Sequence, residues 1–139
     1  NIFSNIASSE QTHTDAVLDL MTAYKVEDSA SQSMGVFNNA ELAQLYGDLI
    51  AKVDRSVEDA LIVGATIEDL DILDLDEKAT HTDNLALQSL YSILKCGSEN
   101  HMRSFTRQLN NRALSYEPTY ISQEQYKEIL AATNGSCGN

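Results

Sequence analysis

Apolar residues recur at steps of three and four positions through most of this 139-residue chain, and this spacing is the period of an α-helix. It predicts four substantial helices and a short C-terminal one, over about residues 2–24, 40–53, 57–79, 83–109 and 122–130. The chain has one proline and six glycines, so few positions interrupt a helix. No stretch reads as a convincing strand. The sequence therefore predicts an all-α fold.

Polar residues mark where these helices begin. The small and polar stretch 25–38 predicts a loop, and Asn38 or Asn39 can cap the helix that follows it. Ser56, or Asp54 before it, can start the third helix, since Ser56 and Asp59 have the spacing of a capping box. Thr82 or Asp83 is expected to start the fourth helix, Ser122 caps the last one, and an extended piece is expected around 116–120. We expect one domain over 1–133 and a flexible tail over 134–139.

The charge balance limits the classes of partner that the protein could bind. The formal net charge is −12, from 21 acidic and 9 basic residues. This sign argues against nucleic-acid binding, which needs a basic face, and it is compatible with attracting cations or simply with solubility. No run approaches the roughly 18 to 20 apolar residues of a membrane span. We therefore predict neither nucleic acid nor a membrane-spanning segment.

Two cysteines and one short motif bear on the compartment. Cys96 and Cys137 either form a disulfide or remain as a buried thiol and a tail thiol. Asn134 begins an N-glycosylation acceptor pattern, which matters only in a secreted protein. The chain starts with Asn1 rather than methionine, which is compatible with the loss of a signal peptide, a pro-segment or another N-terminal piece. The compartment stays undetermined, with a secreted or cell-surface setting among the options.

Polar residues interrupt the apolar stripes of three helices. Glu10 and His13 follow Ile6 at helical steps, Glu68 and Asp71 lie between Leu61 and Leu75, and Ser98 and His101 lie between Leu94 and Phe105. Burying an unpaired carboxylate costs several kcal/mol, so such groups on converging helices need a common partner. Carboxylates and imidazole are ligands for iron and manganese, and Glu-x-x-His puts both donors on one helical face. The stripes therefore predict a metal site.

Each of these residues also has a structural interpretation. A single Glu-x-x-His occurs by chance on charged helices, and His13 can be an exposed or satisfied histidine. Glu68 begins an acidic run, 68–77, that could form a solvated face. His101 could be a core histidine bonded to a backbone carbonyl. Gly97, within the fourth helix, either bends that helix or permits close packing.

Several segments in order make the chain resemble a known family. They are Asn5 to His13, Gly35 to Asn39, Leu45-Tyr46, Asp59 to Ile72, Gly97 to Phe105 and Tyr116 to Ser122. The chain resembles the uncharacterised DUF2202 family of ferritin-like, rubrerythrin-related proteins, over almost its whole length to about Ile129.

The resemblance implies a ferritin-like four-helix bundle with a dinuclear iron site. By this analogy Glu10 and His13 match the ligand pair of the second bundle helix, and His101 matches the histidine of the fourth. Glu68 matches the acid of the third bundle helix, with Asp71 one turn further on. The helix over 40–53 would belong to the connection between bundle helices.

The chain departs from the family pattern at two places. Ser98 stands where ferritin-like sites usually have a glutamate, and Asp71 is a conceivable substitute for it. The family's glutamate-rich first helix lies upstream of the segment with which this sequence begins. We therefore expect that helix, or a neighbouring copy in a homo-oligomer, to complete the bundle and to cover an otherwise open apolar groove.

Two functions of different class follow. The first is a non-haem di-iron or iron–manganese protein that acts on O2, peroxide or Fe(II) as an oxidase, a peroxidase or an iron-binding protein, with an external electron donor. The second is a non-enzymatic bundle with a degenerate metal site, serving as a structural, surface or self-assembling module. Reversible metal binding or storage without turnover is a third possibility. The sequence leaves the choice of metal and substrate open.

Overall fold

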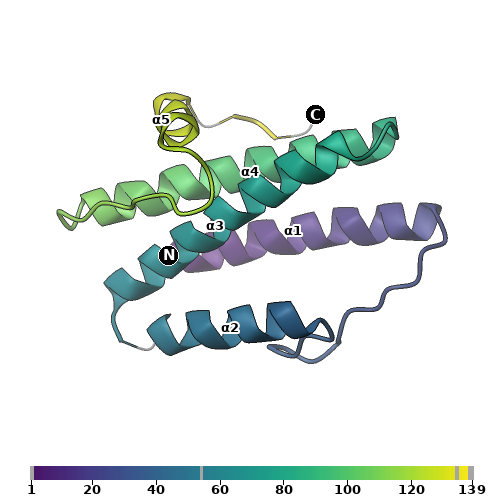
Figure 1. Ribbon diagram of the computed structural model, residues 1–139, viewed down its shortest axis with the longest axis horizontal. Helices are drawn as coiled ribbons and strands as arrows, with labels where there is room; N and C mark the ends of the chain where they lie inside the picture. The colour runs from purple at the N-terminus through teal and green to yellow at the C-terminus, as the bar shows by residue number, and fades with distance from the viewer. Residues whose placement is uncertain (1, 54, 134, 138–139) are drawn as a thin grey trace.

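The structure, a computed structural model, describes residues 2–53, 55–133 and 135–137. Within these residues it consists of helices joined by irregular segments, without strands (Figure 1). The helices are α1 (Ile2–Ala23), α2 (Ala40–Val53), α3 (Val57–Thr80), α4 (Leu85–Asn110) and α5 (Gln123–Ala131). The predicted all-α fold is confirmed, and the helix bounds lie close to those expected from the apolar period.

Side-chain caps explain where four of the helices begin. Asn39, Ser56 and Ser122 each accept a hydrogen bond from a backbone N–H in the first turn of the helix that follows. The expectation for α4 was wrong by one or two residues, because Asn84 rather than Thr82 or Asp83 is its N-cap. The Thr82 hydroxyl oxygen instead accepts the N–H of Asn84 at 3.1 Å, so it supports the cap from outside the helix.

Two helices end in a left-handed residue that is not glycine. Lys25 follows α1 with φ 56°, and Ala113 follows α4 with φ 57°. After each of them the chain turns back, since Val26 N–H donates to Met21 O at 2.9 Å and Leu114 N–H donates to Leu109 O at 3.0 Å. This is the hydrogen-bond pattern of a helix terminus that normally uses glycine. Both positions therefore store conformational strain.

The core is built around the α3–α4 pair. These two helices make the most extensive contact in the fold, and α5 crosses α4 on the side away from α1 and α2 (Figure 1). Buried apolar residues from α3, α4, α5 and the 116–121 segment form one cluster: Leu61, Ala65, Ile72, Met102, Phe105, Leu109, Tyr116, Ile121, Tyr126 and Ile129. Burial of these side chains fixes α3 against α4.

The side of the α3–α4 pair that faces α1 and α2 is more open. α1 packs against α4 and α2 packs against α3, but neither α1 nor α2 contains a buried residue. Large apolar side chains on this side remain more than a third exposed: Phe3, Leu18, Leu42, Tyr46 and Ile50. No described helix is both long and apolar enough to cross a membrane.

Asp69 ties α3 to the segment before α5. This fully buried carboxylate accepts the Tyr116 hydroxyl at 2.8 Å and the backbone N–H groups of Thr119, Tyr120 and Ile121 at 2.6, 3.0 and 2.9 Å. A carboxylate with this many donors is well stabilised without water. Asp69 thereby fixes which face of α3 lies against the 116–121 segment.

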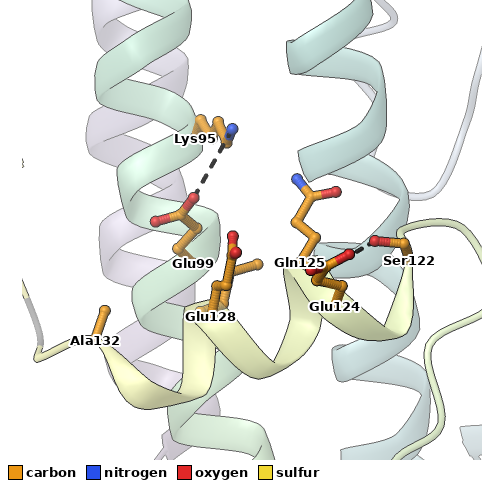
Figure 2. Close-up of a pocket in the computed structure, with 8 residues that line it drawn as sticks. Lys95, Glu99, Ser122, Glu124, Gln125, Glu128 and Ala132 are labelled. Atoms are coloured by element: carbon orange, nitrogen blue, oxygen red, sulfur yellow. Dashed lines mark hydrogen bonds and ion pairs between the residues drawn. The ribbon is translucent and has the colours of Figure 1, made fainter.

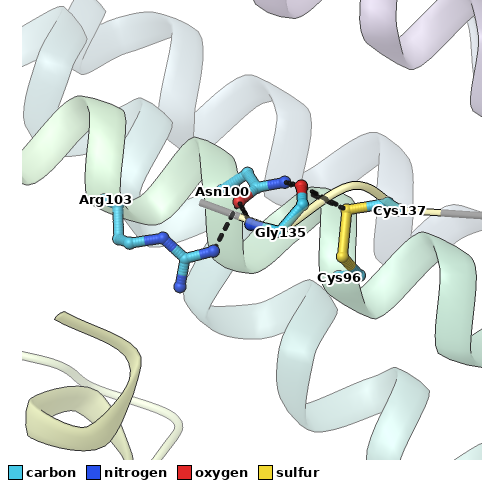
Figure 3. The surroundings of a disulfide bond; sticks show 5 residues. All are labelled: Cys96, Asn100, Arg103, Gly135 and Cys137. Atoms are coloured by element: carbon cyan, nitrogen blue, oxygen red, sulfur yellow. Dashed lines mark hydrogen bonds between the residues drawn. A yellow bond between two sulfur atoms is a disulfide. The ribbon is translucent and has the colours of Figure 1, made fainter. Parts of the chain in front are cut away.

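A disulfide joins the C-terminal segment to α4. Cys96 and Cys137 are bonded, and Asn100 exchanges two hydrogen bonds with the backbone of Gly135 (Figure 3). Residues 135–137 of the predicted flexible tail therefore lie against α4. The predicted glycosylation site Asn134 and residues 138–139 lie outside the described residues.

Candidate metal centre

Three of the stripe-interrupting residues meet between α1, α3 and α4. Glu10, Glu68 and His101 each offer a ligand atom, and these atoms all lie within 4.8 Å of one another. His101 Nδ1 is 2.8 Å from Glu10 Oε1 and 3.3 Å from Glu68 Oε1. Two acids and an imidazole from three helices thus converge on one small volume.

His13 extends this cluster along α1. Its Nδ1 atom lies 3.1 Å from Glu10 Oε2, and its ring centre is 5.8 Å from that of His101. Glu10 therefore stands between the two histidines, with one oxygen near each. The Glu-x-x-His pair of α1 faces α4, as its place in the apolar stripe predicts.

The cluster leaves buried polar atoms without hydrogen-bond partners. Glu10 Oε1, Glu68 Oε2 and His101 Nδ1 are buried atoms that make no hydrogen bond, although His101 Nδ1 lies within ion-pair distance of both acids. An unpaired buried polar atom costs about 1–3 kcal/mol, and more when it is charged. A cation among these atoms would satisfy all three, so the donor set fits a metal ion.

Burial and charge shift the pKa values of the cluster. Burial raises the pKa of Glu68, and this effect exceeds the opposing effect of His101. Burial alone would lower the pKa of His101, but the carboxylates of Glu10 and Glu68 raise it to about 9. Burial likewise works to raise the pKa of Glu10, but the two histidines lower it overall. These shifts favour a protonated His101 beside the two acids when no metal is bound.

Asp71 lies beside this cluster rather than within it. It lines a pocket of about 360 Å³ together with Glu10 and Glu68, among apolar side chains of α1, α2, α3 and α4. Burial, followed by the charges of Glu68 and Glu10, raises the pKa of Asp71 to about 7. Asp71 can therefore exchange a proton near neutral pH at the open edge of the cluster.

The surroundings of Glu68, His101 and Ser98 distinguish between the alternative interpretations of these residues. Glu68 is 3% exposed, so it does not belong to a solvated face, whereas Asp74 and Glu77 further along the acidic run are exposed. His101 Nδ1 faces the two carboxylates. Ser98 is buried, and its side chain works to lower the pKa of Glu68 against the larger, raising effect of burial. Ser98 thus supports a candidate ligand instead of being one.

A second, polar pocket of about 480 Å³ lies between α4 and α5 (Figure 2). It is lined by Lys95 and by three acids, Glu99, Glu124 and Glu128. Lys95 already pairs with Asp76 at 2.5 Å and approaches Glu99 at 4.0 Å. This pocket contains no unpaired buried ligand atom among the described residues, so the metal hypothesis rests on the other side of α4.

The fold and the site define an all-helical protein with a partly buried cluster of carboxylates and histidines between three helices. The chain belongs to the DUF2202 family, an uncharacterized protein domain whose pattern matches residues 1–133.

One curated relative is the uncharacterized protein MJ0754 of Methanocaldococcus jannaschii, which is 50% identical over 133 residues, 95% of this chain and 72% of that protein. The crystal structure of hypothetical protein MJ0754 from Methanococcus jannaschii DSM 2661 superposes with a TM-score of 0.93, over 96% of this chain and 77% of that one. At this identity the relative supports both the fold and the family.

Proposed function

We propose that the protein binds iron or manganese at Glu10, Glu68 and His101, and that it is a ferritin-like non-haem metalloprotein of the oxidase, peroxidase or iron-binding type. His13 is a further ligand in this proposal. Asp71 takes the position of an additional carboxylate at the edge of a site for two ions. The observation that carries the proposal is the convergence of ligand atoms from three helices, three of them buried without a hydrogen bond.

The residue types support this assignment. Mixed carboxylate and imidazole donors suit iron and manganese, and helical bundles hold such ions by side chains that project inward. A bound iron or manganese ion would supply redox chemistry toward O2 or peroxide. The chain itself adjusts protonation at the site: burial raises the pKa of Glu68, His101 and Ser98 work against this rise, and Asp71 can hold or release a proton beside the ligands.

Metal titration of the metal-free protein tests the proposal. Fe(II) under argon, and Mn(II) separately, should bind to the wild type, and Glu68→Gln and His101→Ala should each weaken binding by roughly tenfold or more, about 1.4 kcal/mol. The matched controls are Glu77→Gln and His81→Ala, which change the same residue types at exposed positions of α3 and its C-cap. A wild type that binds neither ion, or controls that lose as much affinity as the site variants, would contradict it.

The second candidate is a non-enzymatic module that assembles through its open side. The exposed apolar residues of α1 and α2 favour this function, because large exposed apolar patches usually mark interaction sites. In this case a second copy covers the patch, and the metal site is structural or degenerate. Light scattering coupled to size exclusion would show a dimer or a larger assembly, and the iron-loaded protein would consume neither O2 nor peroxide.

A further inference from the structure

Gly97 lies where α4 passes closest to the His13 ring. A Cβ atom built on Gly97 would lie 2.3 Å from His13 Cε1 and 2.5 Å from Nε2. Both distances are far below van der Waals contact, so any side chain at position 97 would displace the imidazole. Gly97 therefore provides the space that His13 occupies.

The backbone of α4 does not itself require this glycine. α4 is continuous from Leu85 to Asn110, and Gly97 has no positive φ. Glycine within a helix is less stable than alanine by about 0.8–1.0 kcal/mol. Of the two alternatives that the sequence left open for Gly97, a bend in α4 or close packing, the close approach of His13 supports close packing.

The position of His13 affects the orientation of the proposed ligand Glu10. His13 Nδ1 lies 3.1 Å from one oxygen of Glu10, and the other oxygen of Glu10 lies 2.8 Å from His101 Nδ1. The His13 side chain is only 15% exposed, which limits its freedom to rotate away. A displaced His13 ring would leave Glu10 without one of its two contacts.

We propose that Gly97 is a positioning residue of the metal site, acting through His13. It lets the imidazole lie against α4, and this placement orients Glu10 between the two histidines. The inference deepens the proposed function and rests on it for metal affinity. The geometric part applies equally to the metal-free protein.

A double-mutant cycle tests this role with Co(II) alone as the probe. Gly97→Ala should weaken binding about as much as His13→Ala, on the order of tenfold, and should change the visible spectrum of bound Co(II). The double variant should bind no more weakly than His13→Ala alone, because the clash partner is already gone. Gly47→Ala is the control, since a Cβ there meets nothing within 4 Å.

Unchanged Co(II) affinity in Gly97→Ala would overturn the inference, and so would additive losses in the double variant. If Gly97→Ala fails to fold, His13→Ala should restore folding in the same chain. Failure of that rescue would count equally against the proposed contact.

The metal-free protein provides a readout that is independent of the proposed function. Gly97→Ala should shift the imidazole NMR signals of His13, whereas Gly47→Ala should leave them in place. Unshifted His13 signals would refute the contact whether or not the protein binds a metal. A wild type that binds no metal would refute the proposed function, while the shift would still show that Gly97 positions His13.

Discussion

The Asp69 carboxylate accepts a hydrogen bond from the Tyr116 hydroxyl at 2.8 Å, and this contact fixes the face of α3 that carries Glu68. Consecutive residues in a helix point about 100° apart. With Asp69 held by the 116–121 segment, Glu68 is directed toward α1 and α4. Two neighbouring acids in one run thus have separate tasks, since one anchors the fold and the other belongs to the candidate site.

Replacement of Asp69 by asparagine should destabilise the protein by about 3 kcal/mol, because a charged acceptor with four donors becomes a neutral amide. Urea unfolding followed by circular dichroism measures the change. Asp74→Asn is the control, since Asp74 is exposed and pairs with Lys78 one turn away, an interaction of about 0.3–0.5 kcal/mol. An equal effect of the two substitutions would show that the Asp69 anchor is not special.

The metal-free protein should lose stability as pH rises. The pKa of Asp71 is raised from 3.8 to about 7, and that of His101 from 6.5 to about 9. Both side chains bind a proton more tightly in the folded than in the unfolded protein. Each therefore adds its full stabilisation below its unfolded pKa, and this stabilisation is lost as the pH rises through its folded pKa. The urea midpoint of unfolding, measured with a chelator present, should therefore fall as the pH rises from about 4 to about 9.

Two variants assign that dependence to its groups. Asp71→Asn should flatten the acidic part of the profile, and His101→Ala should flatten the alkaline part. Stability that rises steadily with pH in the wild type would contradict these pKa directions.

Substitution of Ala113 by glycine should stabilise the protein by about 1 kcal/mol. Alanine costs roughly 1–2 kcal/mol in the left-handed conformation, and the greater flexibility of glycine in the unfolded chain offsets only part of that gain. Thermal unfolding reports the difference. Ala132→Gly is a suitable control, since Ala132 has φ −73° at the end of α5 and should lose stability instead. A loss at both positions would show that Ala113 is unstrained.

Reduction of the Cys96–Cys137 disulfide should lower the free energy of unfolding by about 4 kcal/mol, given a sequence separation of 41 residues. The Cys96→Ser/Cys137→Ser variant should reproduce the effect and should not respond to reductant. Equal unfolding midpoints for the oxidised and reduced wild type would contradict this cross-link.

The helices and the positions of the candidate ligands could be predicted because both follow from the 3.6-residue period. Glu10, Glu68 and His101 stand out as polar residues inside apolar stripes, and a stripe is a local property of the sequence. Asp69 could not be singled out, because its donors lie 47 to 52 positions away and three of them are backbone N–H groups.

Gly97 illustrates a different limit. The sequence left a bend and close packing as equal alternatives, and the choice depends on His13, which lies on another helix. The cap of α4 was misplaced for a smaller reason, since Thr82, Asp83 and Asn84 can all cap a helix and only the backbone geometry decides among them.

The lack of any buried residue on α1 has a consequence for local unfolding. With little apolar area to hold it, α1 should open well before the α3–α4 pair does, and its amide protons should exchange with solvent at a much smaller free energy. Glu10 and His13 belong to this weakly held helix, whereas Glu68 and His101 belong to the stable pair. An ion bound by ligands from both α1 and the α3–α4 pair would hold α1 in place. Hydrogen exchange should then slow along α1 far more than elsewhere in the chain.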